Sequence, residues 1–484
     1  MVLVLTSGLT ALLWNSYGEC LRAFFHFDDF WVLGAAARIE RELPWGVWRI
    51  FQPVHGFLLY RPLSTVGYFL GLRLLFGNDP AAFHAVQLAF QVVNSLLVYA
   101  LALILFRQQL LAIVASIAYA TAPALAIAAC WNSLFTVTGA AFFSFLALLA
   151  WTGWRGPLGA AATCACFAAA LLASEHGVTL SLALAAAAVF LRVRAEERYR
   201  WVVLGGMLSV SAAYVLAKVL YLHFGLEADF PDPAARAFIL QGYAPEWSVS
   251  VALASFGTYL GYAFAPLFWL ARASSTVRVV AGVLLLAAAA LAAVACVRGW
   301  GAHGSARLIG FGITWFLAAV LPVAFLPRHV ASYYGSIGAC GIALAAAAVV
   351  RACRMRWRGV AAAGLAVSIL GIFFTVRSQA LQSDEFAFFR NFTWAAERWL
   401  RSISEVARGA DVDRIAVPDS VLSQLVFVQG RAHEVLLCSH IDVEVVPKGD
   451  SAPAGPRRIF LGEPFWYPRE ELSHRPWLPK RCRE

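Results

Sequence analysis

The sequence predicts an all-α polytopic membrane protein with a small α/β domain at its C-terminal end. Three observations lead to this fold class. The chain of 484 residues is 61% hydrophobic and 14% charged, with a mean hydropathy of +0.70, which lies far from the composition of soluble proteins. Apolar runs close to the length of a membrane-spanning helix recur along most of it. Polar residues gather instead in a long first loop and in the tail. The net charge of +10 therefore needs no nucleic-acid partner.

The first apolar run begins at the N-terminal Met and contains no Lys or Arg before Arg22. No small-residue cleavage site follows it, so we expect it to remain in the membrane as a signal anchor. Candidate spans lie near 2–20, 83–106, 109–130, 133–153, 157–173, 177–191, 201–222, 248–270, 279–297, 308–326, 333–350 and 359–376.

Two arginine-rich connections set the orientation of the chain. They lie at 192–200 and 351–358, and the positive-inside rule places both in the cytoplasm. If every candidate segment crossed, the two would fall on opposite faces. The segment 248–270, which contains Gly257, Gly261 and Pro266, is the best candidate to lie in the interface or re-enter. About eleven spans then remain, although a paired extra crossing would repair the parity equally well.

This orientation collects the polar residues on the extracytoplasmic face. Asp28-Asp29, Glu175-His176, Arg328-His329, the acidic loop 227–232 and the tail from about 377 all lie there. The cytoplasmic connections are short and basic, and they contain neither a P-loop nor a G-x-G-x-x-G turn. Any reaction is therefore expected outside the cytoplasm.

Asp28 and Asp29 are adjacent in a chain that has only 28 acidic residues. Ionised carboxylates at a membrane boundary are costly to desolvate, which favours a chemical role. They could equally mark the end of the first helix in the headgroup region, and the pair alone leaves these two interpretations open. If both face one site, one carboxyl has a raised pKa, and the other would orient an acceptor or hold a divalent ion.

The first extracytoplasmic loop, about 21–82, is expected to contain two helices. Residues 29–42 form an amphipathic pattern that Pro44, Gly46 and Pro53 interrupt. Residues 60–76 are charged at both ends and suit a helix lying in the interface. Gly77-Asn78-Asp79-Pro80 ends that second helix.

The cysteines mostly fall within apolar runs, where they fit small buried residues. These are Cys130, Cys164, Cys166, Cys296 and Cys340. Cys438 and Cys482 lie in the polar tail, where a disulfide is chemically feasible. No C-x-x-C or His-rich spacing predicts a metal cage.

The tail, 377–484, is predicted to form a small extracytoplasmic α/β cap. A helical pattern near 383–408 leads into short apolar runs typical of strands. These runs are 414–417, 434–437, 441–446 and 458–461. No 34-residue repeat follows, so the tail is not a TPR array.

Four short motifs, in the right order, resemble those of GT-C glycosyltransferases that use polyprenyl-phosphate sugars. They are Tyr60-Arg61-Pro62-Leu63-Ser64 with Gly77-Asn78-Asp79-Pro80 and Phe83-His84, the preceding Asp pair, Ser174-Glu175-His176-Gly177, and Trp315-Phe316 through Tyr333-Tyr334-Gly335-Ser336. The likeness is to the TPR-containing O-mannosyltransferases, without their TPR array. It covers roughly 1–400, and Ser174 stands where that family usually has a basic residue.

The resemblance implies a GT-C transmembrane catalytic domain over 1–376 and roles for particular residues. An Asp at the position of Asp28 or Asp29 is implicated as the base that deprotonates an acceptor hydroxyl. Glu175 and His176 would lie near the donor phosphate or the acceptor. Arg61 and Arg328 would neutralise the lipid phosphate, although membrane-flanking arginines also serve as headgroup anchors.

The predicted function is thus transfer of a sugar from a polyprenyl-phosphate donor to a hydroxyl of a glycan, lipid or protein. The competing prediction is a transporter or flippase of a lipid-linked glycan, which would be expected to show internal repeats and polar sites near the midplane. The polar residues cluster at one face instead, which favours catalysis. The Ala- and Arg-rich composition indicates a bacterial inner membrane. Whether a divalent ion takes part stays open.

Overall fold

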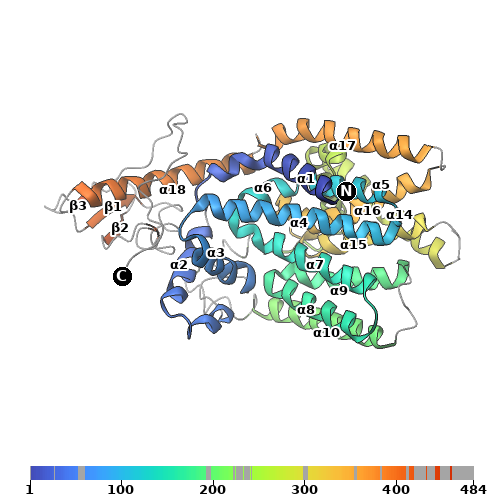
Figure 1. The fold of residues 1–484 in the computed structure, drawn as a ribbon, viewed down its shortest axis with the longest axis horizontal. Helices are drawn as coiled ribbons and strands as arrows, with labels where there is room; N and C mark the ends of the chain where they lie inside the picture. The colour runs from blue at the N-terminus through green and yellow to red at the C-terminus, as the bar shows by residue number, and fades with distance from the viewer. Residues whose placement is uncertain are drawn as a thin grey trace.

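The computed structural model describes residues 2–26, 28–52, 60–191, 198–221, 243–297, 304–353, 357–381, 384–409, 414–418, 442–446 and 458–460, with a few single residues between them. Its main body is a bundle of long helices, and at one end of the bundle lie the first-loop helices and the tail (Figure 1). The predicted all-α membrane domain is confirmed in this coarse form.

Within these residues, seven helices are long and apolar enough to cross a membrane. They are α4 (Pro80–Phe106), α7 (Phe135–Gly153), α8 (Gly156–Ala173), α10 (Arg198–Leu220), α14 (Ser275–Val297), α15 (Ser305–Ala324) and α16 (Ser336–Ala352). The other predicted spans are helical too, but several are shorter or broken. These are α1 (Val2–Tyr17), α5 (Gln109–Ala120), α6 (Leu125–Cys130), α9 (Thr179–Ala186) with η6 (Ala187–Leu191), α13 (Val249–Ala263) and α17 (Arg358–Leu381). The protein is a multi-pass integral membrane protein.

The predicted span 109–130 is divided by Pro123, which lies between α5 and α6. Proline has no N–H to donate and its ring clashes with the preceding turn. The backbone N–H of Ala124, left without a helical acceptor, donates to the carbonyl oxygen of Tyr262 at 2.9 Å. The break therefore ties this segment to α13.

The segment 248–270 was expected not to cross the membrane. It forms α13, of 15 residues, and then breaks at Phe264 into η8 (Ala265–Arg272), where Pro266 occupies the first turn. η8 folds back on the end of α13, and the two approach so closely that a Cβ on Gly261 would lie 2.7 Å from the backbone nitrogen of Ala271. The short, broken helix agrees with that expectation, which remains a prediction.

The first loop has the predicted helices. α2 (Asp28–Arg41) is followed by η2 (Val47–Phe51), and η3 (Leu63–Gly67) leads into α3 (Tyr68–Phe76). Gly77 ends α3 with a φ of 66°, a conformation that glycine adopts without strain. Asp79 then caps α4 by accepting a hydrogen bond from the N–H of Ala81 at 3.0 Å.

The tail begins with α18 (Asp384–Gly409) and continues into a parallel sheet of β1 (Arg414–Pro418), β2 (Asp442–Val446) and β3 (Arg458–Phe460), in the order β2-β1-β3. Three of the four predicted strands are thus present, whereas most of 434–437 lies outside the described residues. α18 extends from the bundle towards the first-loop end (Figure 1). Its apolar side chains, with Phe392, Trp399 and Leu400 among them, share one buried cluster with α2 and α3.

Cys130 corrects the prediction for the cysteines. It is not a free buried thiol but forms a disulfide with Cys20 of η1 (Gly18–Arg22), with the two Cα atoms 5.1 Å apart. Cys340 is free and buried, as predicted, whereas Cys164 is exposed and Cys166 is half-buried in place of the predicted burial. Cys296, Cys438 and Cys482 lie outside the residues whose surroundings are described.

Candidate active site

Asp29 is fully buried at the N-terminus of α2, and both of its carboxylate oxygens accept hydrogen bonds. Oδ2 accepts from the backbone N–H of His26 at 2.9 Å. Oδ1 accepts from the backbone N–H of Ser133 at 2.8 Å and from its hydroxyl at 2.5 Å. The carboxylate therefore joins the first loop to η4 (Asn132–Leu134), which lies between α6 and α7.

Asp28 precedes it on the same helix turn but is only half-buried. None of the described residues donates a hydrogen bond to its side chain. Two carboxylates in the first turn of a helix meet its positive end, which favours their ionised forms. Of the pair, Asp28 is the carboxylate left available to another molecule.

Burial raises the pKa of both carboxyl groups. It raises the pKa of Asp28 to about 6, against the opposing charge of Arg61. It raises the pKa of Asp29 to about 7, although the hydrogen bonds from Ser133 and His26 act in the other direction. A carboxylate with a raised pKa is a stronger base that is still ionised in part near neutral pH.

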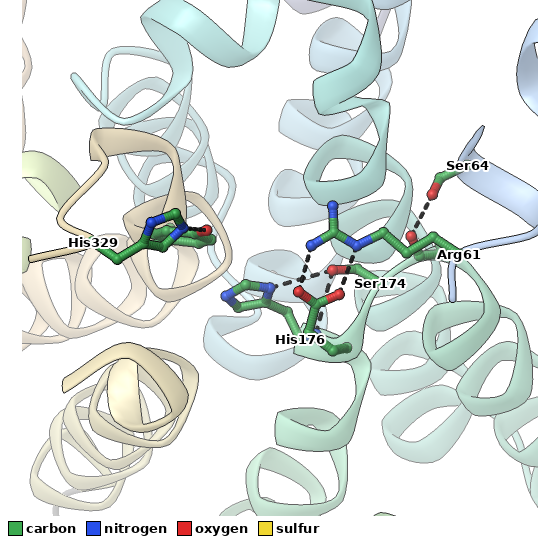
Figure 2. Close-up of polar contacts among 8 residues, drawn as sticks. Arg61, Ser64, Ser174, His176 and His329 are labelled. Atoms are coloured by element: carbon green, nitrogen blue, oxygen red, sulfur yellow. Dashed lines mark hydrogen bonds and ion pairs between the residues drawn. The ribbon is translucent and has the colours of Figure 1, made fainter. Parts of the chain in front are cut away.

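Arg61 and Glu175 form a second, charge-compensated pair. The Arg61 guanidinium donates from Nε to Glu175 Oε2 at 2.6 Å and from Nη2 to Oε1. Figure 2 shows this fork and the remaining guanidinium nitrogen pointing away from Glu175. The pair joins the start of η3 to the turn between α8 and α9. Ser64 strengthens the junction by donating from its hydroxyl to the carbonyl oxygen of Ala173.

The turn that carries Glu175 is built by its neighbours. Ser174 precedes η5 (Glu175–Val178) and its hydroxyl accepts from the N–H of His176 at 3.3 Å. A Cβ on Gly177 would lie 2.5 Å from the carbonyl carbon of Ala170, so only glycine fits there. Ser174 therefore caps the turn, which gives it a structural role in place of a basic residue.

The pKa of Glu175 is shifted in the opposite direction to those of the Asp pair. Burial would raise the pKa of Glu175, but the charge and hydrogen bonds of Arg61 outweigh burial and hold the pKa at about 2. It is therefore a permanent anion in this turn. A carboxylate so compensated cannot act as a base near neutral pH.

Aromatic and imidazole rings surround the Arg61–Glu175 pair. His176 stacks on Tyr334, with ring centroids 5.0 Å apart. His329 approaches the Tyr334 hydroxyl to 2.7 Å through Nε2, and its ring lies 4.4 Å from that of Tyr243. Figure 2 places His329 across from Arg61 and His176. Tyr243, Tyr334 and Ser133 were missed as site residues, and only the Tyr333-Tyr334 motif gave a signal for one of them.

The carboxylate pair and the ion pair belong to one electrostatic environment. The charge of Arg61 lowers the pKa of Asp28 in opposition to burial. Burial raises the pKa of Tyr243 to about 12, and the charges of Arg61, Glu175 and Asp28 all act on this phenol. The charges of both pairs therefore influence the pKa of the Tyr243 phenol. The predicted residues Asp28, Asp29, Arg61, Glu175 and His176 come together.

Arg328 is the predicted site residue that the structure does not bring into this network. It is exposed in the turn after α15, one residue before His329. No described residue pairs with it. Its predicted contact with a lipid phosphate stays a prediction.

A metal cage is not formed by the described residues, which contain no group of three or more His, Cys, Asp or Glu side chains able to hold an ion. The donor set of the Asp pair explains this. Both oxygens of Asp29 already accept hydrogen bonds, so the pair offers an ion one available carboxylate. Hard divalent cations bind more oxygen ligands than that.

No family model matches the chain, and no curated protein sequence does. Similar solved structures are found at 11–14% identity and TM-scores below 0.5.

One counterpart is ArnT from Cupriavidus metallidurans bound to undecaprenyl phosphate, with a TM-score of 0.46, 14% identity, and coverage of 90% of this chain and 76% of that one. Another is the oligosaccharyltransferase AglB from Archaeoglobus fulgidus with an inhibitory peptide and a dolichol-phosphate. Its TM-score is 0.48 and its identity 13%, and the match covers 89% of this chain and 63% of that one. An oligosaccharyltransferase of the same archaeon with zinc and sulfate has a TM-score of 0.49 and 12% identity, and the match covers 92% of this chain and 62% of that one. The chain therefore spans less than two thirds of that enzyme's length. At these identities and TM-scores the likenesses assign neither an activity nor individual residues to this chain.

Proposed function

We propose that the protein is a membrane glycosyltransferase that moves a sugar from a polyprenyl-phosphate donor to an acceptor hydroxyl on the extracytoplasmic face. The observation that carries the proposal is the pairing of two kinds of carboxylate in one site. Asp28 is half-buried and has a raised pKa of about 6. Beside it, Arg61 is forked on Glu175 and keeps one guanidinium nitrogen directed elsewhere. The Asp28 carboxylate is suited to accept a proton, and the Arg61 guanidinium is suited to bind an anion.

The reaction is a single displacement. As the acceptor oxygen forms its bond to the anomeric carbon, its proton passes to Asp28. The bond from that carbon to the phosphate oxygen breaks, and its electron pair leaves on polyprenyl phosphate. Attack from the opposite face inverts the anomeric configuration. Asp28 afterwards returns its proton to water. General-base assistance of this kind contributes about 10²–10⁴-fold to rate.

Asp28 is the base in this proposal, and Asp29 is its support. Asp29 is fully buried and accepts three hydrogen bonds, one at Oδ2 from His26 and two at Oδ1 from Ser133, so it is less accessible to an acceptor hydroxyl than Asp28. Asp29 instead fixes the first turn of α2 against η4. That fixed turn sets the direction of the Asp28 side chain.

The leaving phosphate is assigned to the cationic side of the site. The guanidinium of Arg61 is planar and its unused nitrogen can donate to a phosphate oxygen. His329 and Arg328 stand on the turn after α15, where they add positive charge or hydrogen-bond donors. Glu175 holds Arg61 in place, and His176 stacks on Tyr334 in the same turn region. Charge stabilisation of a leaving oxyanion is worth several kcal/mol in such sites.

The finer topology belongs to the same proposal. About eleven spans, with 248–270 not crossing, put the Asp pair, Arg61–Glu175 and the tail on the extracytoplasmic side of a bacterial inner membrane. Nucleotide-sugar donors are not expected there, and lipid-linked donors are. The 377–484 tail is proposed as a cap that helps to hold the acceptor, which is a glycan, lipid or protein.

The test uses the full chain in proteoliposomes with radiolabelled polyprenyl-phosphate hexoses and pentoses and an envelope extract as acceptor. We expect label to pass from the donor to the acceptor, and Asp28→Asn to lower kcat by about 10²–10⁴-fold with little change in KM. Glu42→Gln is the matched control, because Glu42 lies in the same loop but pairs with Arg49 on the surface. Full transfer by Asp28→Asn would remove the base assignment.

The transporter remains the alternative function and is tested in the same vesicles. A fluorescent lipid-linked glycan placed in one leaflet reports flipping through its access to an external quencher. Flipping without any sugar transfer by the parent protein would replace the glycosyltransferase with a flippase. Transfer without flipping would exclude the flippase.

A further inference from the structure

The Cys20–Cys130 disulfide joins two segments 110 residues apart, with Cα atoms at 5.1 Å, a separation usual for disulfides. Cys20 lies in η1 at the end of α1, and Cys130 is the last residue of α6. Both half-cystines are buried, at 7% and 0% exposure. The bond therefore links the two chain segments that enter the carboxylate site.

The position of the bond relative to Asp29 is the important point. From Cys20 the chain runs through the buried Phe24 and Phe25 to His26, whose N–H donates to Asp29 at 2.9 Å. From Cys130 it runs through Trp131 to Ser133, whose N–H donates to the same carboxylate at 2.8 Å. The disulfide and the Asp29 hydrogen bonds thus close one ring made of residues 20–26, the Asp29 carboxylate and residues 130–133.

A ring contact crosses the interior of this closed structure. The indole of Trp131 packs edge to face on the imidazole of His26, with centroids 4.8 Å apart. Such a ring pair is a weak non-covalent contact, which is modest beside a covalent link. Without the disulfide, the donors to Asp29 would come from two segments held together by packing and hydrogen bonds alone.

We propose that the Cys20–Cys130 disulfide is a positioning device for the carboxylate pair and that it completes the site only on the oxidising side of the membrane. The proposal rests on the proposed function, since it gives the Asp pair a catalytic role. In forming the bond, the two thiols lose two protons and two electrons to a protein disulfide donor, which is reduced to a dithiol. Such donors act in the periplasm and outside cells. The sidedness inferred from the arginines therefore has a second, independent basis.

Loss of the disulfide is expected to lower the pKa values of the Asp28 and Asp29 carboxyl groups. The segments separate, water reaches the first turn of α2, and burial no longer raises the two carboxyl pKa values to the same degree. The acid limb of activity then moves to lower pH. Because the acceptor and the donor phosphate do not bind the cystine, kcat falls more than KM changes.

The first experiment maps the bond by mass spectrometry of the full chain, alkylated and digested without reduction. We expect a linked pair of peptides containing Cys20 and Cys130. The second compares the variant Cys20→Ala/Cys130→Ala with Cys340→Ala, which removes a buried free thiol outside the site. Carbodiimide with glycine ethyl ester probes the carboxyl groups, and labelled Asp29 is quantified.

The double variant is expected to label Asp29 at least tenfold faster than the Cys340→Ala control, to lose about 10–100-fold in kcat with KM within threefold, and to shift its acid limb downwards. Missing linked peptides would overturn the proposal. So would linked peptides together with labelling and a pH profile equal to those of Cys340→Ala. If the parent protein transfers no sugar, the labelling still decides the positioning role, and only the proposed function fails.

Discussion

The Asp28–Asp29 pair and the Arg61–Glu175 pair place the same functional group in opposite electrostatic states. Asp28 is half-buried and Asp29 is fully buried, neither is forked on a cation, and their pKa values rise to about 6 and about 7. Glu175 is equally enclosed, yet Arg61 compensates it and holds its pKa at about 2. Burial therefore produces a carboxylate of raised pKa only where no paired cation compensates its charge.

The two pairs also differ in what they connect. Asp29 ties the start of the first loop to η4 through Ser133. Arg61 ties a later part of the loop to the α8–α9 turn through Glu175. The loop is thus fixed at two points, and the half-buried Asp28 lies beside the first. The following predictions test whether these two attachments have separate roles.

The largest effect is expected from Arg61→Met. Glu175 would stay buried without its cation, which destabilises a protein by about 3–5 kcal/mol. Replacing both partners, as Arg61→Met/Glu175→Met, should recover most of that loss because no unpaired charge remains. Unfolding midpoints in detergent measure both. Equal midpoints for the single and double variants would show that the ion pair does not fix the loop.

The pH dependence is the next largest effect. Asp28 must be ionised to accept a proton, so kcat/KM should rise with pH up to about 6 and level off above it. Below that value activity should fall about tenfold per pH unit. Initial rates across pH 4–9 with one donor measure it, with Glu42→Gln run in parallel. An acid limb of the pH–rate profile near the ordinary pKa of an exposed Asp would contradict the raised pKa of Asp28.

Glu175→Gln should move that limb. The variant leaves the charge of Arg61 uncompensated, and because this charge opposes the raised pKa of Asp28, the acid limb should move to lower pH. The donor should bind no more weakly, since the guanidinium is then freer to meet a phosphate. The shift is read from the same rate profiles. An unchanged limb would separate the two pairs electrostatically.

The smallest effect is expected for Ser133→Ala. It removes the hydroxyl donor to Asp29 but keeps the backbone N–H, so stability should fall by about 1 kcal/mol. The loss of a hydrogen bond to the carboxylate raises the pKa of Asp29 further. Activity should fall about two- to fivefold, and Ser133→Thr should restore it. A loss as large as that of Asp28→Asn would instead assign Asp29 to the chemistry.

The sequence alone predicts the helical bundle well, because apolar periodicity and Pro or Gly breaks act locally. The helices at 29–42 and 60–76 and the strands at 414–417 and 441–446 all appear close to their predicted limits. The break at Pro123 inside 109–130 was missed. Pro123 causes the break, and the carbonyl oxygen of Tyr262, from a distant part of the chain, accepts the N–H of Ala124 that the break leaves without a helical acceptor.

The site divides in the same way. The motifs identified Asp28, Asp29, Arg61, Glu175 and His176 individually. Their pairing depends on contacts such as Arg61 with Glu175, 114 residues away, and no local pattern predicts these. Ser133, Tyr243 and the partner of Cys130 were missed for this reason. Their residue types are common, and only the packing of the bundle gives them a role.

The buried cluster that α18 shares with the first loop has a consequence for biosynthesis. Phe392 lies against His26, with ring centroids 5.0 Å apart, and Trp399 and Leu400 are buried in the same cluster as α2. α2 is synthesised before α18, and the spans of the bundle lie between them in the chain. α3 packs on α2 as soon as the first loop is made, but the part of the shared cluster that α18 covers stays exposed until the intervening spans have been synthesised. A chaperone of the membrane surface would be most needed during that interval, and a nascent chain that stops before 384 would keep its first loop incomplete.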